Sequence, residues 1–192
     1  MDYVFCKFKP GKHACRLKTL QDVDDTFELL KGVTRKRGWP ESAYFKMSES
    51  FPNDLLTEDF ISNREKALVV SERVREFVEA KKLKNAEFLP VGIVNHKGRR
   101  IDEKYFVLNL LEIQDCIDMK ASKYTQNKID PEEFMAITKL VINEDKVGSD
   151  LLLFRPKRYA DLPIAHRSFA DAVTAAGFTG IKFGEIKDWN GA

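Results

Sequence analysis

The sequence contains few cysteines and no paired cysteine motif. Cys6, Cys15 and Cys116 are the three cysteines among 192 residues. An odd number without CxxC spacing argues against a disulfide framework and favours a reducing compartment. The sequence also lacks an apolar run long enough to span a membrane, and its first residues lack the apolar stretch of a secretion signal. We therefore expect a soluble, cytoplasmic protein.

An excess of charge of one sign is also absent. Lysine and arginine number 32 against 30 aspartates and glutamates, which gives a net charge of +2. Dedicated nucleic-acid binders usually carry a marked basic excess, because phosphate contacts supply much of their affinity. Nucleic acid is therefore not the expected partner. Local basic clusters still leave a nucleic-acid-binding module as the alternative function; they comprise residues 35–37, 96–100 and 155–158.

Catalytic and phosphate-binding motifs are missing as well. The sequence has no Gly-x-Ser-x-Gly nucleophile motif, no GxGxxG fingerprint and no Walker lysine motif. The glycine pair of residues 177–180 follows an expected helix, whereas phosphate loops precede a helix and use its N-terminal amides. We therefore expect no cofactor and no enzyme activity.

Cysteine and histidine provide the few remaining candidates for chemistry. Cys6, His13 and Cys15 lie close in sequence but lack the fourth ligand of a usual zinc site. Cys116 has no histidine nearby in sequence, so a catalytic pair would need His96 or His166 to meet it in space. We expect neither a metal site nor a catalytic residue; an unrecognised cysteine or histidine enzyme stays a third hypothesis.

The overall composition is that of a folded globular protein. Hydrophobic residues make up 43% of the chain and charged residues 32%. A chain of this length buries roughly two-thirds of its unfolded surface, so it needs no disulfide or metal to fold. We expect one domain over residues 1–192, or that domain divided into two lobes, 1–120 and 121–192.

Hydrophobic patterns predict strands separated by short helices. Val23, Phe27 and Leu30 recur at helical spacing, and the acidic run Asp130-Pro131-Glu132-Glu133 is typical of a helix start. β-branched and aromatic runs predict strands at residues 3–8, 68–70, 88–94, 105–111 and 151–154.

A shift of 95 residues aligns residues 68–88 with residues 163–183 without a gap. The apolar stripe Val74, Phe77 and Val78 then falls on Phe169, Ala172 and Val173. Ser71, a good helix N-cap, falls on His166. The sequence therefore predicts an α+β fold with a mixed, largely antiparallel sheet, a few short helices and two similar strand–helix–strand units.

Several short sequence motifs, taken in their order along the chain, indicate a resemblance to a known family. They include Gly38-Trp39-Pro40-Glu41-Ser42, ALVVSERV (67–74), EFLPV (87–91), YFVLN (105–109), CID (116–118), KLV (139–141), LFR (153–155) and GFTGIKF (177–183). Together they resemble bacterial polymorphic-toxin immunity protein family eleven, first described as a domain of unknown function. The resemblance covers residues 38–186.

This resemblance implies a cytoplasmic protein that takes part in bacterial competition by binding and neutralising a cognate secreted toxin. The toxins paired with this family are often nucleases of the HNH type, so a nuclease is the expected partner. The resemblance carries no catalytic residues. It leaves open the toxin's identity, the mode of inhibition and the oligomeric state.

The partner-binding surface is expected to combine carboxylates with aromatic anchors. Acidic groups favour association with a basic nuclease cleft, and tryptophan and tyrosine commonly carry interface energy. Because the net charge is near zero, a purely acidic decoy is not expected. The candidate residues are Asp22, Asp24, Asp25, Glu28, Trp39 and Tyr44.

Overall fold

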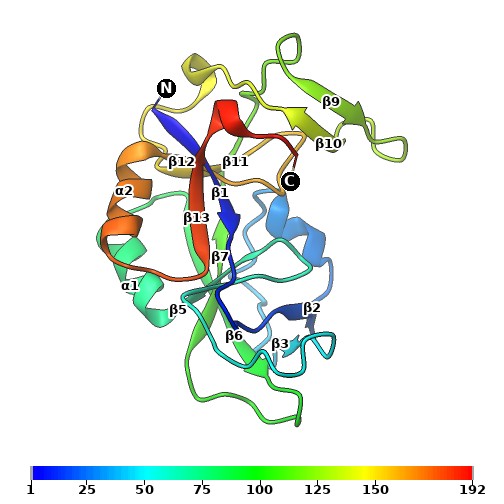
Figure 1. Cartoon of the computed structure of the whole chain (residues 1–192), viewed down its shortest axis with the longest axis vertical. Helices are drawn as coiled ribbons and strands as arrows, with labels where there is room; N and C mark the ends of the chain where they lie inside the picture. Colours follow the sequence, from blue (N-terminus) through cyan, green and yellow to red (C-terminus); the bar gives the residue numbers. More distant parts are fainter. Residues whose placement is uncertain (1, 192) are drawn as a thin grey trace. The chain divides into compact units, whose positions relative to one another are not determined.

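The computed structural model describes residues 2–191 (Figure 1). The chain divides into two compact units. Unit 1 comprises Met1–Lys7, Glu112–Ala176 and Lys182–Ala192, and unit 2 comprises Phe8–Leu111 and Gly177–Ile181. Each unit is therefore assembled from segments that are distant in sequence. The expectation of one domain over residues 1–192 stays a prediction.

Unit 2 is built on a mixed six-stranded sheet. Its strands, in spatial order, are β2 (Leu17–Gln21), β3 (Tyr44–Met47), β6 (Ala86–Val94), β7 (Tyr105–Leu110), β5 (Leu68–Ser71) and β4 (Phe60–Ile61). The β3–β6 pair is parallel and the other pairs are antiparallel. Leu89, Val91 and Ile93 alternate along β6 into the core, as the two-residue period of a strand requires.

Unit 1 contains a five-stranded sheet and a separate two-stranded ribbon. The sheet runs β13 (Ile181–Glu185), β1 (Tyr3–Phe8), β12 (Ile164–His166), β11 (Leu153–Pro156) and β8 (Ile113–Gln114). The antiparallel ribbon pairs β9 (Lys123–Gln126) with β10 (Phe134–Lys139). Phe154, Ile164 and Ile186 are fully buried in the hydrophobic core of unit 1. There the Trp189 indole donates a hydrogen bond to the Ile137 carbonyl at 2.8 Å.

The two predicted strand–helix–strand units are confirmed with the predicted offset. Helices α1 (Glu72–Ala80) and α2 (Arg167–Ala175) begin and end 95 residues apart, as do the first residues of β6 and β13. One strand lies between the two strands of each unit: β7 between β5 and β6, and β1 between β12 and β13. Ser71 and His166 cap the two helices by accepting backbone N–H bonds from Val74 and Ser168.

Both helices end on a left-handed residue, also 95 positions apart. Lys82 has φ 55° and Gly177 has φ 68°. A side chain at such a position strains the backbone, whereas glycine adopts it freely. We expect Lys82→Gly to raise the free energy of unfolding by about 0.5–1 kcal/mol, because the relieved strain exceeds the added entropy of the unfolded glycine.

Chemical denaturation of Lys82→Gly and of Gly177→Ala measures this effect. The second variant places a side chain at the equivalent position and should lose about 1 kcal/mol. Equal stability of Lys82→Gly and the wild type would show that the Lys82 backbone is not strained.

The prediction of a helix that starts at Asp130 is wrong. Residues 127–133 form the turn between β9 and β10, in which the Asp130 carboxylate accepts the Glu132 N–H and the Asp130 carbonyl accepts the Glu133 N–H. Aspartate and proline favour tight turns for the same local reasons that they favour helix starts. The following residues pair as strand β10, so no helix propagates.

The α+β fold class is confirmed. Across residues 2–191 the chain has 13 strands, two α-helices of nine residues each, and three short 3-10 helices: η1 (Thr26–Leu30), η2 (Glu144–Lys146) and η3 (Ile186–Asp188). The sheets are mixed and largely antiparallel. Within the same described residues, no helix is both long enough and apolar enough to cross a bilayer.

Candidate functional site

The acidic residues singled out in the sequence gather where β2 leads into η1 in unit 2. Asp22, Asp24 and Asp25 are exposed, and Glu28 is half-buried. Asp22 and Asp25 adopt left-handed backbone conformations, with φ 61° and 51°, which aspartate tolerates better than most residues. The chain therefore turns sharply here and presents three carboxylates to solvent.

Phe27 lies between Asp25 and Glu28 in the sequence, 53% of its surface is exposed, and the Lys31 ammonium lies 5.2 Å from its ring centroid. The helical spacing had predicted an apolar stripe of Val23, Phe27 and Leu30, and this is wrong for Phe27. Because η1 is a five-residue 3-10 helix with three residues per turn, Leu29 rather than Phe27 enters the core, at 2% exposure. We call Asp22, Asp24, Asp25, Phe27 and Glu28 the η1 surface.

Arg35 holds the η1 surface in place. Its guanidinium pairs with the Glu28 carboxylate and donates to the backbone carbonyls of Asp24 and Asp25 at 2.7 and 3.5 Å. The Glu28 charge is therefore largely neutralised within the unit. The negative potential of this surface comes mainly from the three aspartates.

A buried carboxylate anchors the segment that carries Arg35. Glu87, 8% exposed on β6, accepts hydrogen bonds from the Thr34 hydroxyl at 2.8 Å, the Arg35 N–H at 2.6 Å and the Asn109 amide at 2.8 Å. Asn109 also donates to the Val33 carbonyl. Charge-assisted bonds of this kind are stronger than neutral ones, so residues 33–35 are tied firmly to β6 and β7.

The two aromatic candidates are half-buried next to this region. The Trp39 indole donates to the Pro90 carbonyl at 2.8 Å and packs against the core of unit 2. Tyr44 begins β3, where it pairs with Gln21, the residue before Asp22, and with Gly92 on β6. The structure thus places Tyr44 beside the start of the η1 surface, while Trp39 is partly occupied in holding its own segment.

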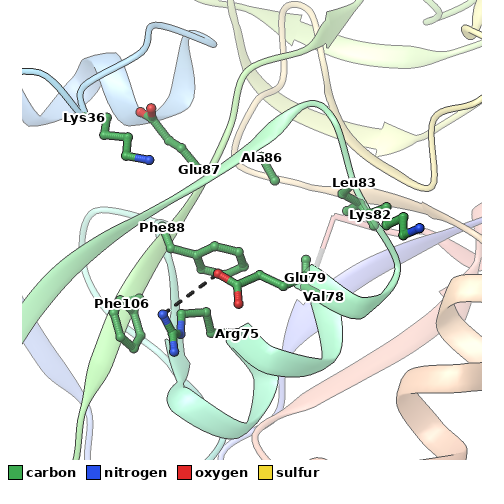
Figure 2. A pocket seen from close by; sticks show the side chains of 10 residues that line it. All are labelled: Lys36, Arg75, Val78, Glu79, Lys82, Leu83, Ala86, Glu87, Phe88 and Phe106. Carbon is green, nitrogen blue, oxygen red and sulfur yellow. Dashed lines mark ion pairs between the residues drawn. The ribbon is translucent and has the colours of Figure 1, made fainter.

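A cavity of about 390 Å³ in unit 2 lies between α1 and the strands β6 and β7 (Figure 2). Two phenyl rings, Phe88 and Phe106, meet edge to face there with centroids 6.3 Å apart. The other lining residues are Lys36, Arg75, Val78, Glu79, Lys82, Leu83, Ala86 and Glu87. The lining therefore combines charged side chains with apolar ones.

Arg75 dominates the chemistry of this cavity. Its guanidinium lies 4.8 Å from the Phe106 ring centroid and pairs with Glu79 at 3.9 Å, as the dashed line in Figure 2 shows. Among the described residues its Nε atom is buried without a hydrogen-bond partner. Arg75 also pairs with Glu72 at 3.5 Å, and the cations Lys36 and Lys82 share the lining with the carboxylates of Glu79 and Glu87, so the charges of the cavity largely balance.

The three cysteine thiols are buried and unpaired among the described residues. Burial raises the pKa of Cys116 to about 11 and that of Cys15 to about 12, and it raises the pKa of Cys6 as well. A nucleophilic cysteine needs the opposite shift, because the thiolate is the reactive form. Within residues 2–191, no three His, Cys, Asp or Glu side chains are grouped to hold a metal ion.

The three histidines lie in different local environments. His166 caps α2, as its alignment with Ser71 predicted. His96 lies in the turn after β6, and among the described residues both of its ring nitrogens are buried without a hydrogen-bond partner. His13 is exposed and lies 3.7 Å from Asp54.

Some cations of the basic clusters are buried or ion-paired within the fold. Arg35 pairs with Glu28, and Arg155 is 1% exposed, with its pKa lowered to about 10 by burial. Arg100 lies so close to β6 that a Cβ at Gly92 would be 2.5 Å from its Nε atom. The clusters 35–37 and 155–158 therefore each offer one fewer cation to a phosphate chain than the sequence indicates, whereas Lys97, Arg99 and Arg100 are exposed.

Sequence reasoning missed Phe27 as a surface residue and missed the cavity. The exposure of Phe27 depends on the choice between a 3-10 and an α-helix, which its apolar spacing does not reveal. The cavity joins Lys36 to residues of α1, β6 and β7 that are about 40–70 positions away. The run of Asp22, Asp24 and Asp25 was the one local signal in the sequence that indicated the η1 surface.

Comparison with known families gives one clear result. The model of a family described as an immunity protein family (Imm11) matches residues 12–188, which is most of the chain. A search of curated proteins finds no match. The matched range contains the η1 surface, the cavity and both strand–helix–strand units.

Proposed function

The chain belongs to the Imm11 family of immunity proteins, and we propose that it protects its producer by binding a cognate antibacterial toxin and blocking that toxin's activity. The family match over residues 12–188 is the observation that carries this proposal. The protein acts by binding alone, without chemistry of its own. Buried thiols with raised pKa values support this non-enzymatic role.

The η1 surface is the proposed contact with the toxin. The exposed Phe27 ring, which has the Lys31 ammonium 5.2 Å from its centroid, offers an apolar anchor, and the exposed aspartates that precede it in the chain offer charges that steer a basic partner. Arg35 and Glu87 order this surface before binding, so little conformational entropy is lost on association. Trp39 and Tyr44 extend the proposed contact on its β3 side.

The finer features of the partner follow from the chemistry of this surface. A nuclease toxin, for example of the HNH type, has a cationic cleft for phosphates, and the three aspartates complement such a cleft. The protein then works in the cytoplasm of its producer, where it occludes or deforms the toxin's active site.

A nucleic-acid-binding module is supported less well. The buried Arg155 and the paired Arg35 are unavailable for phosphate contacts. Such a module would show affinity for DNA or RNA that falls steeply with added salt.

Co-expression with the toxin encoded beside this gene tests the proposal. Cells that produce the toxin domain should survive when they also produce this protein, and should die when they produce an unrelated protein of similar size. The two purified proteins should also elute as one complex. Death of cells that contain abundant soluble protein would reject the assignment.

A further inference from the structure

The ribbon of unit 1 ends in a turn with a defined backbone. The turn is closed at its base by the hydrogen bond from the Asn127 N–H to the Glu133 carbonyl, at 3.2 Å. The Gln126 carboxamide bridges its far side by donating to the carbonyls of Pro131 and Glu133, at 2.6 and 2.9 Å. Next to the turn, the Tyr124 ring stacks on the buried Phe134 with centroids 4.1 Å apart.

This turn presents Ile129 to solvent with 95% of its surface exposed. The Asn127 carboxamide oxygen accepts the N–H groups of both Ile129 and Asp130, at 2.9 and 3.3 Å, which fixes the backbone under the isoleucine. Met135 on β10 adds a second apolar side chain, 65% exposed. An isoleucine held outward on an ordered turn exposes apolar surface that folding of the chain itself does not use.

The charges around Ile129 are mostly negative. Residues 127–133 contain three acidic residues, Asp130, Glu132 and Glu133, and one basic residue, Lys128. An apolar tip with an acidic border complements a small apolar recess with a basic border. The η1 surface of unit 2 likewise combines an exposed apolar side chain, Phe27, with acidic residues.

We infer that the β9–β10 turn is a second toxin contact, in which Ile129 enters an apolar recess on the basic surface of the toxin. This inference rests on the proposed immunity function. The acidic border disfavours a second copy of this chain as the occupant. In a two-fold interface centred on this turn, the two copies of the turn would meet at the axis with their carboxylates against one another.

Titration against the toxin domain of the neighbouring gene tests the inference. We expect Ile129→Glu to weaken binding about 10-fold or more, because it places a charge in the apolar recess, and Ile129→Leu to change affinity less than threefold. The exposed position predicts the same denaturation midpoint for both variants. A photo-cross-linking residue at position 129 should attach covalently to the toxin domain even if Ile129→Glu proves unstable.

The outcomes separate this inference from the proposed function. Wild-type binding with unchanged affinity of Ile129→Glu and no cross-link from position 129 would reject the second contact and leave the immunity function standing. Failure of the wild type to bind the toxin domain would reject both. Weakened binding by Ile129→Glu, together with retained binding by Ile129→Leu, supports the contact.

Discussion

Truncating Phe27 to alanine should lower the affinity for the toxin about 100-fold, because buried aromatic anchors carry a large share of interface energy. The ring is 53% exposed in the free chain, so its removal costs the fold little. Calorimetric or surface-based titration against the toxin domain measures the change, and a denaturation curve checks that the variant is folded.

Phe51 provides a matched control for this experiment. It is also a phenylalanine of unit 2, 40% exposed, and its ring lies 4.0 Å from the Arg16 guanidinium carbon, outside the η1 surface. Phe51→Ala should leave toxin affinity close to the wild-type value. The opposite result, a loss at Phe51 and none at Phe27, would place the contact elsewhere on unit 2.

The contribution of the carboxylates of the η1 surface to toxin binding is tested by substituting asparagine for aspartate. Reversing the charge of Glu28 would break its ion pair with Arg35 and disturb the η1 surface itself. Asparagine at Asp22, Asp24 and Asp25 removes three charges and still tolerates the left-handed backbone at Asp22 and Asp25. If these charges steer association, the triple variant binds more slowly at low salt and the difference shrinks as salt is added.

Asp59→Ala should lower the free energy of unfolding by about 1–3 kcal/mol, because it removes the buried acceptor of three hydrogen bonds. Asp59 is 7% exposed. Its carboxylate accepts from the Ser71 hydroxyl at 2.8 Å, and from the N–H and hydroxyl of Thr179 at 3.0 and 3.3 Å. The Arg73 guanidinium lies 3.6 Å away. One side chain thereby joins the N-cap of α1 to the segment Gly177–Ile181 within unit 2.

Asp59→Asn separates hydrogen bonding from packing. The amide keeps the shape of the carboxylate and retains an acceptor for the Thr179 N–H, while its NH₂ group turns toward the Ser71 hydroxyl. Its loss of stability should therefore be about half that of Asp59→Ala. Glu49→Ala, at a surface ion pair with Lys18, should leave the denaturation midpoint nearly unchanged. A wild-type midpoint for Asp59→Ala would contradict the role assigned to Asp59.

Local signals located most of the regular structure. The strand Tyr3–Phe8 has the predicted bounds, and the Ser71 cap and the 95-residue offset to His166 hold to the residue. Caps and alternating strands depend on interactions within a few positions, which a single sequence displays. The acidic run before η1 was visible for the same reason.

The predictions that proved wrong concern features that depend on which other elements pack against a segment. Asp130 and Pro131 favour a turn as well as a helix start, and only the pairing of Phe134 with Gln126 decides for the turn. The apolar spacing of Phe27 indicates a buried face, yet no element packs over that ring closely enough to bury it, and 53% of it stays exposed. Long-range bonds, such as that between Asp59 and Thr179, leave no local trace because their partners are 120 positions apart.

The sequence by itself determined the fold class, the paired strand–helix–strand units, the membership suggested by its ordered phrases and the lack of familiar catalytic motifs. These rest on short-range periodicity, capping and residue identity. The tertiary structure alone decided that Phe27 and Ile129 face solvent, that Glu28 is neutralised by Arg35, and that the cysteines are buried with raised pKa values. The physical reason is that exposure and charge pairing depend on residues brought together from distant parts of the chain.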